Sequence, residues 1–263
     1  MNRGRAWRAA LSCFVALVCL YLVLPTLAIV PVSFSDTDFI IFPPKGLSLR
    51  WYQDFFVNRV WRSATVNSFV IAMATAILAT SLGTAVALGL RHVSAGRVRL
   101  IMWVMLLPML VPSIITAVAL YRSFSTFGLI GTKAGLIVAH TLLAIPFVVI
   151  NVSAVIQKVD WRIVDAARSL GARPRQAFLK VTLPAILPGV FAGGIFAFLT
   201  SFDEVVVAIF LSGVDTTTLP AHMWSGIRFE VSPIIAAASC VLSLLSVFMV
   251  IVSNHMKGRT STL

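Results

Sequence analysis

The chain has 263 residues, of which 59% are hydrophobic and 11% charged, and its formal net charge is +12. Soluble domains are about half apolar, so this composition excludes an ordinary soluble protein and favours an all-α integral membrane protein. The positive charges are spread over short segments between apolar runs instead of being gathered on one soluble face. They indicate membrane topology and contact with lipid, and no nucleic-acid partner is expected.

Six apolar runs are long enough to cross about 30 Å of hydrocarbon, and we expect them to form one domain over residues 1–263. The first run follows Arg3, Arg5 and Arg8, as a secretory signal does, but it is longer than the usual apolar region of about 7–15 residues. We therefore expect it to be retained. The predicted spans cover about 9–32, 63–90, 100–121, 134–157, 185–212 and 232–254.

The orientation follows from the connecting segments. Those on the side of the N-terminus carry more lysine and arginine than those on the opposite side, and the positive-inside rule places such segments in the cytoplasm. Both termini are therefore predicted to be cytoplasmic. The segment of about 158–184 then faces the cytoplasm, and the segment 33–62 lies outside, where its aromatic residues favour a helix at the membrane interface or contact with a partner.

Prolines and glycines punctuate the spans. Each proline removes a backbone donor and bends or ends a helix. Two glycine pairs with GxxxG spacing predict close approach of helices. The prolines are Pro108, Pro112, Pro146, Pro184 and Pro188, and the glycine pairs are Gly131 with Gly135 and Gly189 with Gly193.

The cytoplasmic segment contains signals for a short helix. Asp160 is a good N-terminal cap, Gly171 is a good residue to follow the helix end, and Pro174 stops its continuation and begins a second short helix. The first helix has a narrow apolar stripe made by Ile163, Ala166, Ala167 and Leu170. From the residues alone, the stripe fits either the inner leaflet of the membrane or another protein.

The same segment resembles the EAA loop of permease subunits in binding-protein-dependent ABC importers, which has the pattern E-A-A-x3-G-x9-I-x-L-P. The spacing is intact, with Asp in place of Glu and Val in place of Ile. "NSFVIA" at the start of the second span and the six-span layout extend the resemblance to the whole chain. The matching residues are Asp165, Ala166, Ala167, Gly171, Val181, Leu183 and Pro184.

The resemblance implies a type I ABC importer permease bundle whose cytoplasmic loop forms a coupling helix. That helix would sit in a cleft of the ATPase and transmit its closure to the spans, with Asp165, Ala166, Ala167, Gly171, Leu183 and Pro184 as the coupling residues. The implied partners are two ATPase subunits, a second and different permease, and an external solute-binding protein. The implied location is the bacterial inner membrane.

The acidic residues Asp203 and Glu204 are predicted to lie near the middle of the fifth span, where a charge costs about 2.5–3.5 kcal/mol. We favour Asp203 facing a pathway for an organic cation. The alternatives are pairing with a group such as His140, bonding to backbone freed by prolines, or protonation. The residues expected on the stripe of Asp203 are Phe196, Leu199, Thr200, Val207 and Phe210.

"SFDEVVV" and "TTLPAHMWSGIRFEVSPIIAAAS" resemble the spermidine/putrescine branch of these permeases. The resemblance implies import of a small cationic solute such as putrescine or spermidine, although opine and amino-acid-derivative importers carry similar sequences. In the segment before the last span, several residues are candidates for contact with the binding protein, or for a plain interfacial turn. They are Asp215, His222, Trp224, Arg228 and Glu230.

Other functions find less support. The sequence has no G-x-x-x-x-G-K-[ST] loop, nucleophile elbow or H-E-x-x-H motif, so we expect neither an ATPase nor an intramembrane enzyme. Cys13, Cys19 and Cys240 lack metal-ligand spacing, and no metal or cofactor is expected. The rival is a cation-coupled secondary transporter that uses Asp203 and Glu204 as an ion relay, which leaves the patterned loop unexplained.

Overall fold

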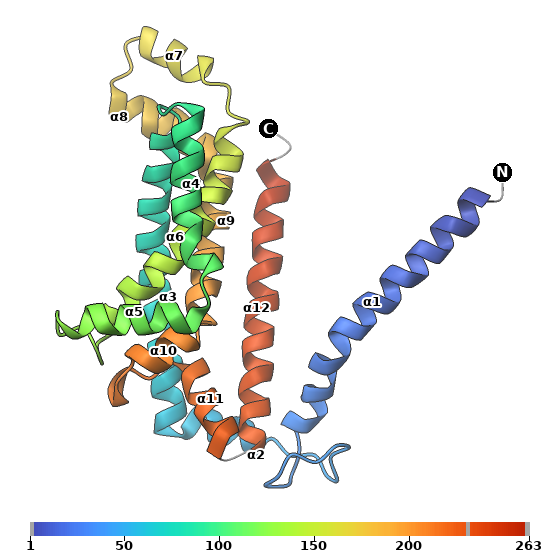
Figure 1. Cartoon of the computed structure of the whole chain (residues 1–263). Helices are drawn as coiled ribbons and strands as arrows, with labels where there is room; N and C mark the ends of the chain where they lie inside the picture. Colours follow the sequence, from blue (N-terminus) through green and yellow to red (C-terminus); the bar gives the residue numbers. More distant parts are fainter. Residues whose placement is uncertain (1–2, 230–231, 261–263) are drawn as a thin grey trace. The chain divides into compact units, whose positions relative to one another are not determined.

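The computed structural model describes residues 3–229 and 232–260, and these are largely helical (Figure 1). In these ranges the β contacts amount to an isolated bridge between Ser35 and Leu47. The helices in chain order are α1 (Arg3–Ser33), α2 (Arg50–Val57), α3 (Arg59–Leu90), α4 (Ala95–Leu110), α5 (Ser113–Ser125), α6 (Lys133–Ile156), α7 (Arg162–Ser169), α8 (Pro174–Ala177), the π-helix η1 (Phe178–Thr182), α9 (Leu183–Phe202), α10 (Val206–Leu211), the 3₁₀ helix η2 (Val214–Thr216), α11 (Leu219–Phe229) and α12 (Pro233–Thr260).

Five helices of the described chain are long and apolar enough to cross a membrane, and a sixth span results if α4 and α5 are taken together. The third predicted span, 100–121, is thus not straight, because α4 and α5 are bent by 98°. Pro112 explains the break. It lacks a backbone N–H, and the preceding Val111 takes the extended conformation that a residue before proline favours.

The chain divides into two compact units, residues 63–224 with 246–263, and residues 1–62 with 225–245. In the first unit, α6 and α9 pack closely, as the Gly189/Gly193 pair predicts. A Cβ at Gly193 would lie 3.0 Å from the Cα atom of Val148, and one at Gly189 would lie 2.9 Å from a methyl carbon of Val155. Only glycine allows the two backbones to come so near.

The second GxxxG prediction is wrong in its geometry. Gly131 precedes α6 and lies in a turn with a φ of +74°, whereas Gly135 belongs to the first turn of α6. Gly131 instead meets Gly213, where an added Cβ would be 3.0 Å from the Cα atom of Gly131. The close approach is therefore between Gly131 and Gly213, and it joins two non-helical segments instead of two helix faces.

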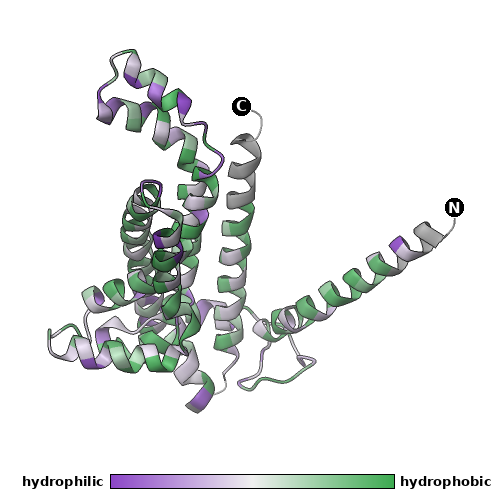
Figure 2. Cartoon of the chain, turned by 45° about the horizontal axis from the view of Figure 1, so that its top comes forward, coloured by the Kyte–Doolittle hydropathy of each residue, from purple (hydrophilic) through white to green (hydrophobic). Residues whose placement is uncertain are grey.

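In the second unit, the predicted aromatic helix is α2. Its residues Trp51 and Phe55 are buried. The hydroxyls of Tyr52 and Ser33 are hydrogen-bonded at 2.7 Å, which joins α2 to the end of α1. Figure 2 shows α1 as a mainly hydrophobic helix, as a membrane span requires.

The fifth predicted span, 185–212, differs in two places. It begins earlier, because α8, η1 and α9 form one helical run of 29 residues from Pro174 to Phe202. The π-turn before Pro184 accommodates a residue that cannot donate to a regular α-helix. The run also ends earlier than expected, because the chain leaves the helix at Asp203 and resumes as α10 at Val206.

Candidate functional site

The first candidate region is the segment 160–184, which lies at one end of its unit, while α10 lies at the other (Figure 1). The short helix α7 is closed by its own backbone and side chains. The Asp160 carboxylate accepts a hydrogen bond from the Arg162 N–H at 3.0 Å. Helix α7 begins at Arg162, one residue later than it would if Asp160 were the N-cap. The Asp160 carboxylate still satisfies one of the backbone N–H donors that are free at the start of the helix.

The end of α7 is a Schellman motif centred on Gly171. The Gly171 N–H donates to the Arg168 carbonyl at 3.0 Å, and the Ala172 N–H donates to the Ala167 carbonyl at 3.1 Å. Gly171 has a φ of +91°, a conformation that other residues rarely adopt. The prediction that Gly171 ends the helix is confirmed, and the resulting turn leads the chain from α7 toward α8.

The apolar stripe of α7 is open. Ile163 is 59% exposed and Leu170 is 90% exposed, while Ala166 is exposed and Ala167 partly so. Hydrophilic residues alternate with these apolar residues in the α7 and α8 region, in contrast to the long green helices (Figure 2). The stripe is therefore open to contact with either of the two predicted neighbours, the inner leaflet of the membrane or another protein.

The remaining EAA-pattern residues extend from this surface into the bundle. The Asp165 side chain is exposed, and its backbone carbonyl accepts a bond from the Ser169 hydroxyl at 3.1 Å. Leu183 is partly buried, and Pro184 is exposed in the first turn of α9. The pattern thus covers both an exposed helix and the start of a buried one, joined by continuous backbone.

The second candidate region is the break at 203–205. Thr200 and Glu204 help to line a cavity of about 220 Å³. The cavity lies where the α4–α5 bend meets α6, α9 and α10, so two interrupted helices face each other. Irregular backbone at membrane depth is tolerated where it is buried in protein or lines a cavity. The other lining residues are Pro108, Met109, Val111, Ser113, Thr116, Leu143, Phe147 and Val207.

Glu204 has a structural task at this break. Its carboxylate Oε1 accepts a hydrogen bond from the Val207 N–H at 3.0 Å, at the start of α10. The second carboxylate oxygen leaves acceptor capacity in a cavity lined by both apolar side chains and the hydroxyl residues Ser113, Thr116 and Thr200. The arrangement can hold a positively charged group near Glu204 with apolar and aromatic surface around it.

The other predicted pathway residues separate. Asp203 is exposed and lies outside the lining of this cavity. Phe196 is not part of the lining, but it stacks on the lining residue Phe147, with the ring centroids 6.4 Å apart. Phe210 packs against the buried cluster that includes Val207 and Leu211. The expected stripe required a continuous helix, and the break after Phe202 replaces Asp203 with Glu204 at the cavity.

His140 forms a buried polar pair with Ser201 beside the break. The His140 Nδ1 and Ser201 Oγ atoms are 2.8 Å apart, and they join α6 to the end of α9. His140 is 1% exposed. The alternative in which His140 pairs with Asp203 or Glu204 is therefore not what the structure shows, because the partner of His140 Nδ1 is Ser201.

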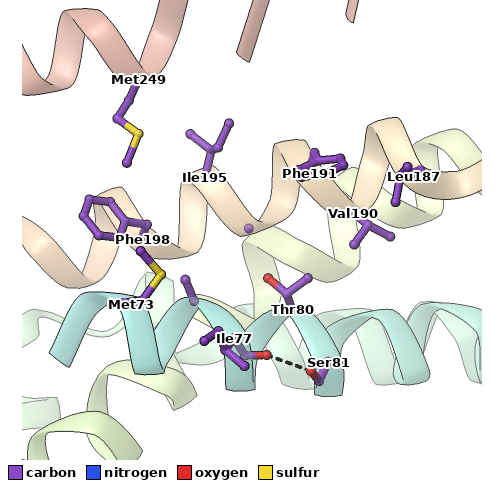
Figure 3. Close-up of a pocket in the computed structure, with 12 residues that line it drawn as sticks. Met73, Ile77, Thr80, Ser81, Leu187, Val190, Phe191, Ile195, Phe198 and Met249 are labelled. Atoms are coloured by element: carbon purple, nitrogen blue, oxygen red, sulfur yellow. Dashed lines mark hydrogen bonds between the residues drawn. The ribbon is translucent and has the colours of Figure 1, made fainter. Parts of the chain in front are cut away.

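A larger cavity of about 530 Å³ lies between α3 and α9 (Figure 3). Met73 and Ile77 of α3 and Phe191 and Phe198 of α9 contribute to it, together with Met249 of α12. Its lining is almost wholly apolar, since the Ser81 hydroxyl is turned to the Ile77 carbonyl at 2.8 Å (Figure 3). Such a lining suits hydrocarbon better than a charged solute.

The segment 213–219 is tied to α3 by buried polar side chains. The Asn67 amide donates to the carbonyls of Asp215 at 2.9 Å and Thr217 at 3.1 Å. The Ser68 hydroxyl accepts from the Leu219 N–H at 2.8 Å. Sequence reasoning missed these roles, although both residues belong to "NSFVIA".

The side chains predicted as candidates for contact with a binding protein lie within this segment or follow it in the sequence. Asp215, Trp224 and Arg228 are exposed. Burial lowers the pKa of the His222 imidazole below its ordinary value. Glu230 lies outside the described residues.

Comparison with known proteins supplies independent findings. Residues 79–260 match the family described as "Binding-protein-dependent transport system inner membrane component". The chain is 30% identical over 243 residues to the spermidine/putrescine transport system permease protein PotC of Haemophilus influenzae, covering 92% of this chain and 94% of that protein. It is 32% identical over 231 residues to the putrescine permease PotI of Escherichia coli, covering 84% and 81%. The trehalose permease SugB of Mycobacterium tuberculosis is 29% identical, covering 93% of each chain.

Among solved structures, a chain of a bacterial ABC transporter that imports the acidic polysaccharide alginate has a TM-score of 0.73. It shares 14% sequence identity and covers 97% of this chain and 98% of its own. At this identity the likeness shows the fold, which is that of an ABC importer permease.

Proposed function

This chain belongs to the family of binding-protein-dependent transport system inner membrane components, and on that premise we propose that its solute is a polyamine such as putrescine or spermidine. The chain is a multi-pass inner-membrane permease subunit of an ABC importer. We place α7 and both termini in the cytoplasm, as the distribution of lysine and arginine favours. Its partners in this proposal are two ATPase subunits, a second permease and an external solute-binding protein.

We assign the coupling of ATP hydrolysis to the segment 160–184. The exposed stripe of α7 offers Ala166 and Ala167, whose small side chains let a partner approach closely, flanked by the exposed Ile163 and Leu170. The Schellman turn at Gly171 satisfies backbone carbonyls at the end of the helix and so gives it a defined end. The helices α8, η1 and α9 form one continuous helical run into the bundle. A displacement of α7 is therefore transmitted through α8 and η1 to α9.

The observation that carries the substrate proposal is the position of Glu204. A carboxylate at membrane depth that lines a cavity with Thr200 and Phe147 supplies charge for an ammonium group and a ring for cation–π contact. The apolar part of the lining, which includes Leu143 and Val207, suits the methylene chain of a polyamine. The exposed carboxylate of Asp203, one residue earlier, would extend the negative field of this station.

The relatives support this proposal unevenly. PotC and PotI are named for polyamines, whereas SugB, with almost the same identity, is named for trehalose. Overall similarity therefore gives the transport class, and the acidic cavity selects the cation within that class.

Uptake by reconstituted vesicles tests the proposal. The complex is assembled in liposomes with its ATPase and binding protein. Entry of labelled spermidine, putrescine, trehalose and an opine is measured with and without ATP on the side of the membrane that carries the ATPase subunits. We expect ATP-dependent entry of the polyamines only. Entry that follows an ion gradient without ATP would instead support a secondary transporter.

A matched pair of variants tests the coupling assignment. Ala167→Trp places a bulky side chain on the proposed docking stripe, and Ala95→Trp places one on the exposed first turn of α4. We expect only the former to lose co-purification of the ATPase subunit. Equal retention by both variants would remove α7 from the interface.

A further inference from the structure

The helix α3 is in contact with the polar segments at both of its ends. At one end, Arg91 follows the last residue of α3, and its guanidinium carbon lies 3.6 Å from the ring centroid of Trp161. Trp161 directly precedes α7. A cation this close to an indole face is held by electrostatic attraction, so the end of α3 is joined to the start of α7 although the two are distant in sequence.

At the other end, Asn67 and Ser68 hold the segment 213–219. The Asn67 amide bridges two backbone carbonyls, and Ser68 accepts from the Leu219 N–H. Asn67 and Ser68 are 3% and 2% exposed. Because buried polar groups are costly to leave unpaired, this segment must follow α3 when α3 moves.

Between these two joints α3 is an unbroken helix without an internal proline. Asn67 and Arg91 are separated by about 36 Å along its axis. A Cβ at Gly83 would lie 2.7 Å from the Cβ atom of Val148, so α3 packs tightly on α6 at a point between Asn67 and Arg91. A continuous helix pressed against a neighbour shifts as a unit more readily than it bends.

We propose that α3 is a transmission element that relays movement of α7 to the segment 213–219, with Arg91 and Trp161 as one joint and Asn67 and Ser68 as the other. Arg91 is a positioning residue in this scheme, since it acts through Trp161. The proposal rests on the assigned coupling role of α7 and extends it. The backbone on either side of α7 transmits its movement to α6 and α9. The Arg91–Trp161 contact transmits the same movement to α3.

The test uses the complete complex in lipid nanodiscs and measures ATP hydrolysis with and without the solute-loaded binding protein. Arg91→Gln removes the cation, and Asn67→Ala removes the other joint. We expect the basal rate to stay unchanged in both variants, and the stimulation by the binding protein to fall by about threefold or more. Arg91→Lys keeps a cation over the ring and should restore part of the stimulation.

Controls separate this role from general damage. Arg97→Gln removes an equal charge from the first turn of α4 and leaves the Arg91–Trp161 pair intact, so it should keep full stimulation. Trp161→Phe keeps an aromatic face and should behave like Arg91→Lys. The double variant Arg91→Gln with Asn67→Ala should lose no more than the worse single variant, because both joints belong to one path.

Full stimulation in Arg91→Gln and Asn67→Ala would overturn the proposal. Independent losses that multiply in the double variant would also overturn it, since they would place the two joints on separate paths. If the unmodified complex shows no stimulation by its binding protein, the proposed function itself fails, and the relay fails with it.

Discussion

Two polar interruptions in an otherwise apolar chain have opposite surroundings. The segment 160–173 is exposed, and α7 is closed by its own hydrogen bonds at Asp160 and Gly171. The break at 203–205 is supported by its neighbours, with Glu204 capping α10 and lining a cavity formed by several helices. A self-supporting exposed helix suits a macromolecular partner, whereas a carboxylate held by the surrounding bundle suits a small charged ligand.

Removing the charge from the break should give the largest effect. Glu204→Gln keeps an oxygen that can accept from the Val207 N–H, but it loses the negative charge that we assign to the polyamine. A charged hydrogen bond contributes about 1.5–3 kcal/mol, so we expect the KM for spermidine to rise roughly 10-fold to 100-fold. Labelled uptake over a range of spermidine concentrations checks this.

Asp203→Asn is the companion variant. Asp203 is exposed and does not line the cavity, so we expect reduced uptake with assembly intact, but by a smaller factor than Glu204→Gln. If Asp203→Asn has the larger effect, the assignment of the two carboxylates is reversed. Unchanged uptake in both variants would remove the break from the pathway.

The packing beside the break should be sensitive to one hydroxyl. Ser201→Ala leaves the buried His140 Nδ1 without its partner, which costs about 1–3 kcal/mol of stability. Each kcal/mol lowers the Tm by about 2–4 °C in a protein of this size. Ser81→Ala removes an exposed hydroxyl bonded within its own helix and should change the Tm little. Equal Tm values for both variants would show that the buried pair does not support the break.

On the exposed side, the turn at Gly171 depends on its backbone conformation. Gly171→Ala forces a Cβ into a left-handed conformation at about 1–2 kcal/mol, a factor of about 5–30 in the population of the correct turn. Gly96→Ala is the matched control, because both sites have free space for a Cβ and only Gly171 has a positive φ. ATPase co-purification and uptake should fall only for Gly171→Ala, and normal values would show that α7 need not be held rigidly.

The smallest expected effect is a change in the pH dependence of stability at His222. This residue is partly buried, so its surroundings are intermediate between the exposed α7 and the enclosed break. Its folded-state pKa is lowered by burial, so the unfolded chain binds a proton more readily. Its contribution to stability is therefore present above the unfolded pKa of about 6.5 and is lost as the pH falls toward the folded value. His222→Gln should reduce the decrease in Tm between pH 7 and pH 5, and an unchanged pH dependence would contradict this origin.

The same contrast explains what could be predicted. The ends of α7 are specified by nearby residues, so Asp160, Gly171 and Pro174 were enough to predict a short helix, and the Gly189/Gly193 spacing was enough to predict close packing. The coupling and pathway roles of the predicted residues remain proposals. These local signals work because a cap or a left-handed turn is set within a few residues.

The break after Phe202 was missed because no proline or glycine marks it. It lies at the cavity formed with the α4–α5 bend, and the Val207 N–H donates a hydrogen bond to the Glu204 carboxylate there, an arrangement that requires the folded bundle. A helical stripe drawn through Asp203 therefore gave it the place that Glu204 occupies. The roles of Asn67 and Ser68 were hidden for the same reason, since their partners lie about 150 residues later.

The most direct test of the central claim measures spermidine uptake and ATP hydrolysis in the same vesicles for Gly171→Ala and Glu204→Gln. If α7 couples to the ATPase and the break holds the solute, Gly171→Ala lowers ATP hydrolysis and uptake together at every spermidine concentration. Glu204→Gln then raises the spermidine concentration needed for uptake and leaves basal ATP hydrolysis unchanged. The reverse pattern, with Glu204→Gln lowering basal hydrolysis and Gly171→Ala shifting only the spermidine dependence, would contradict the account.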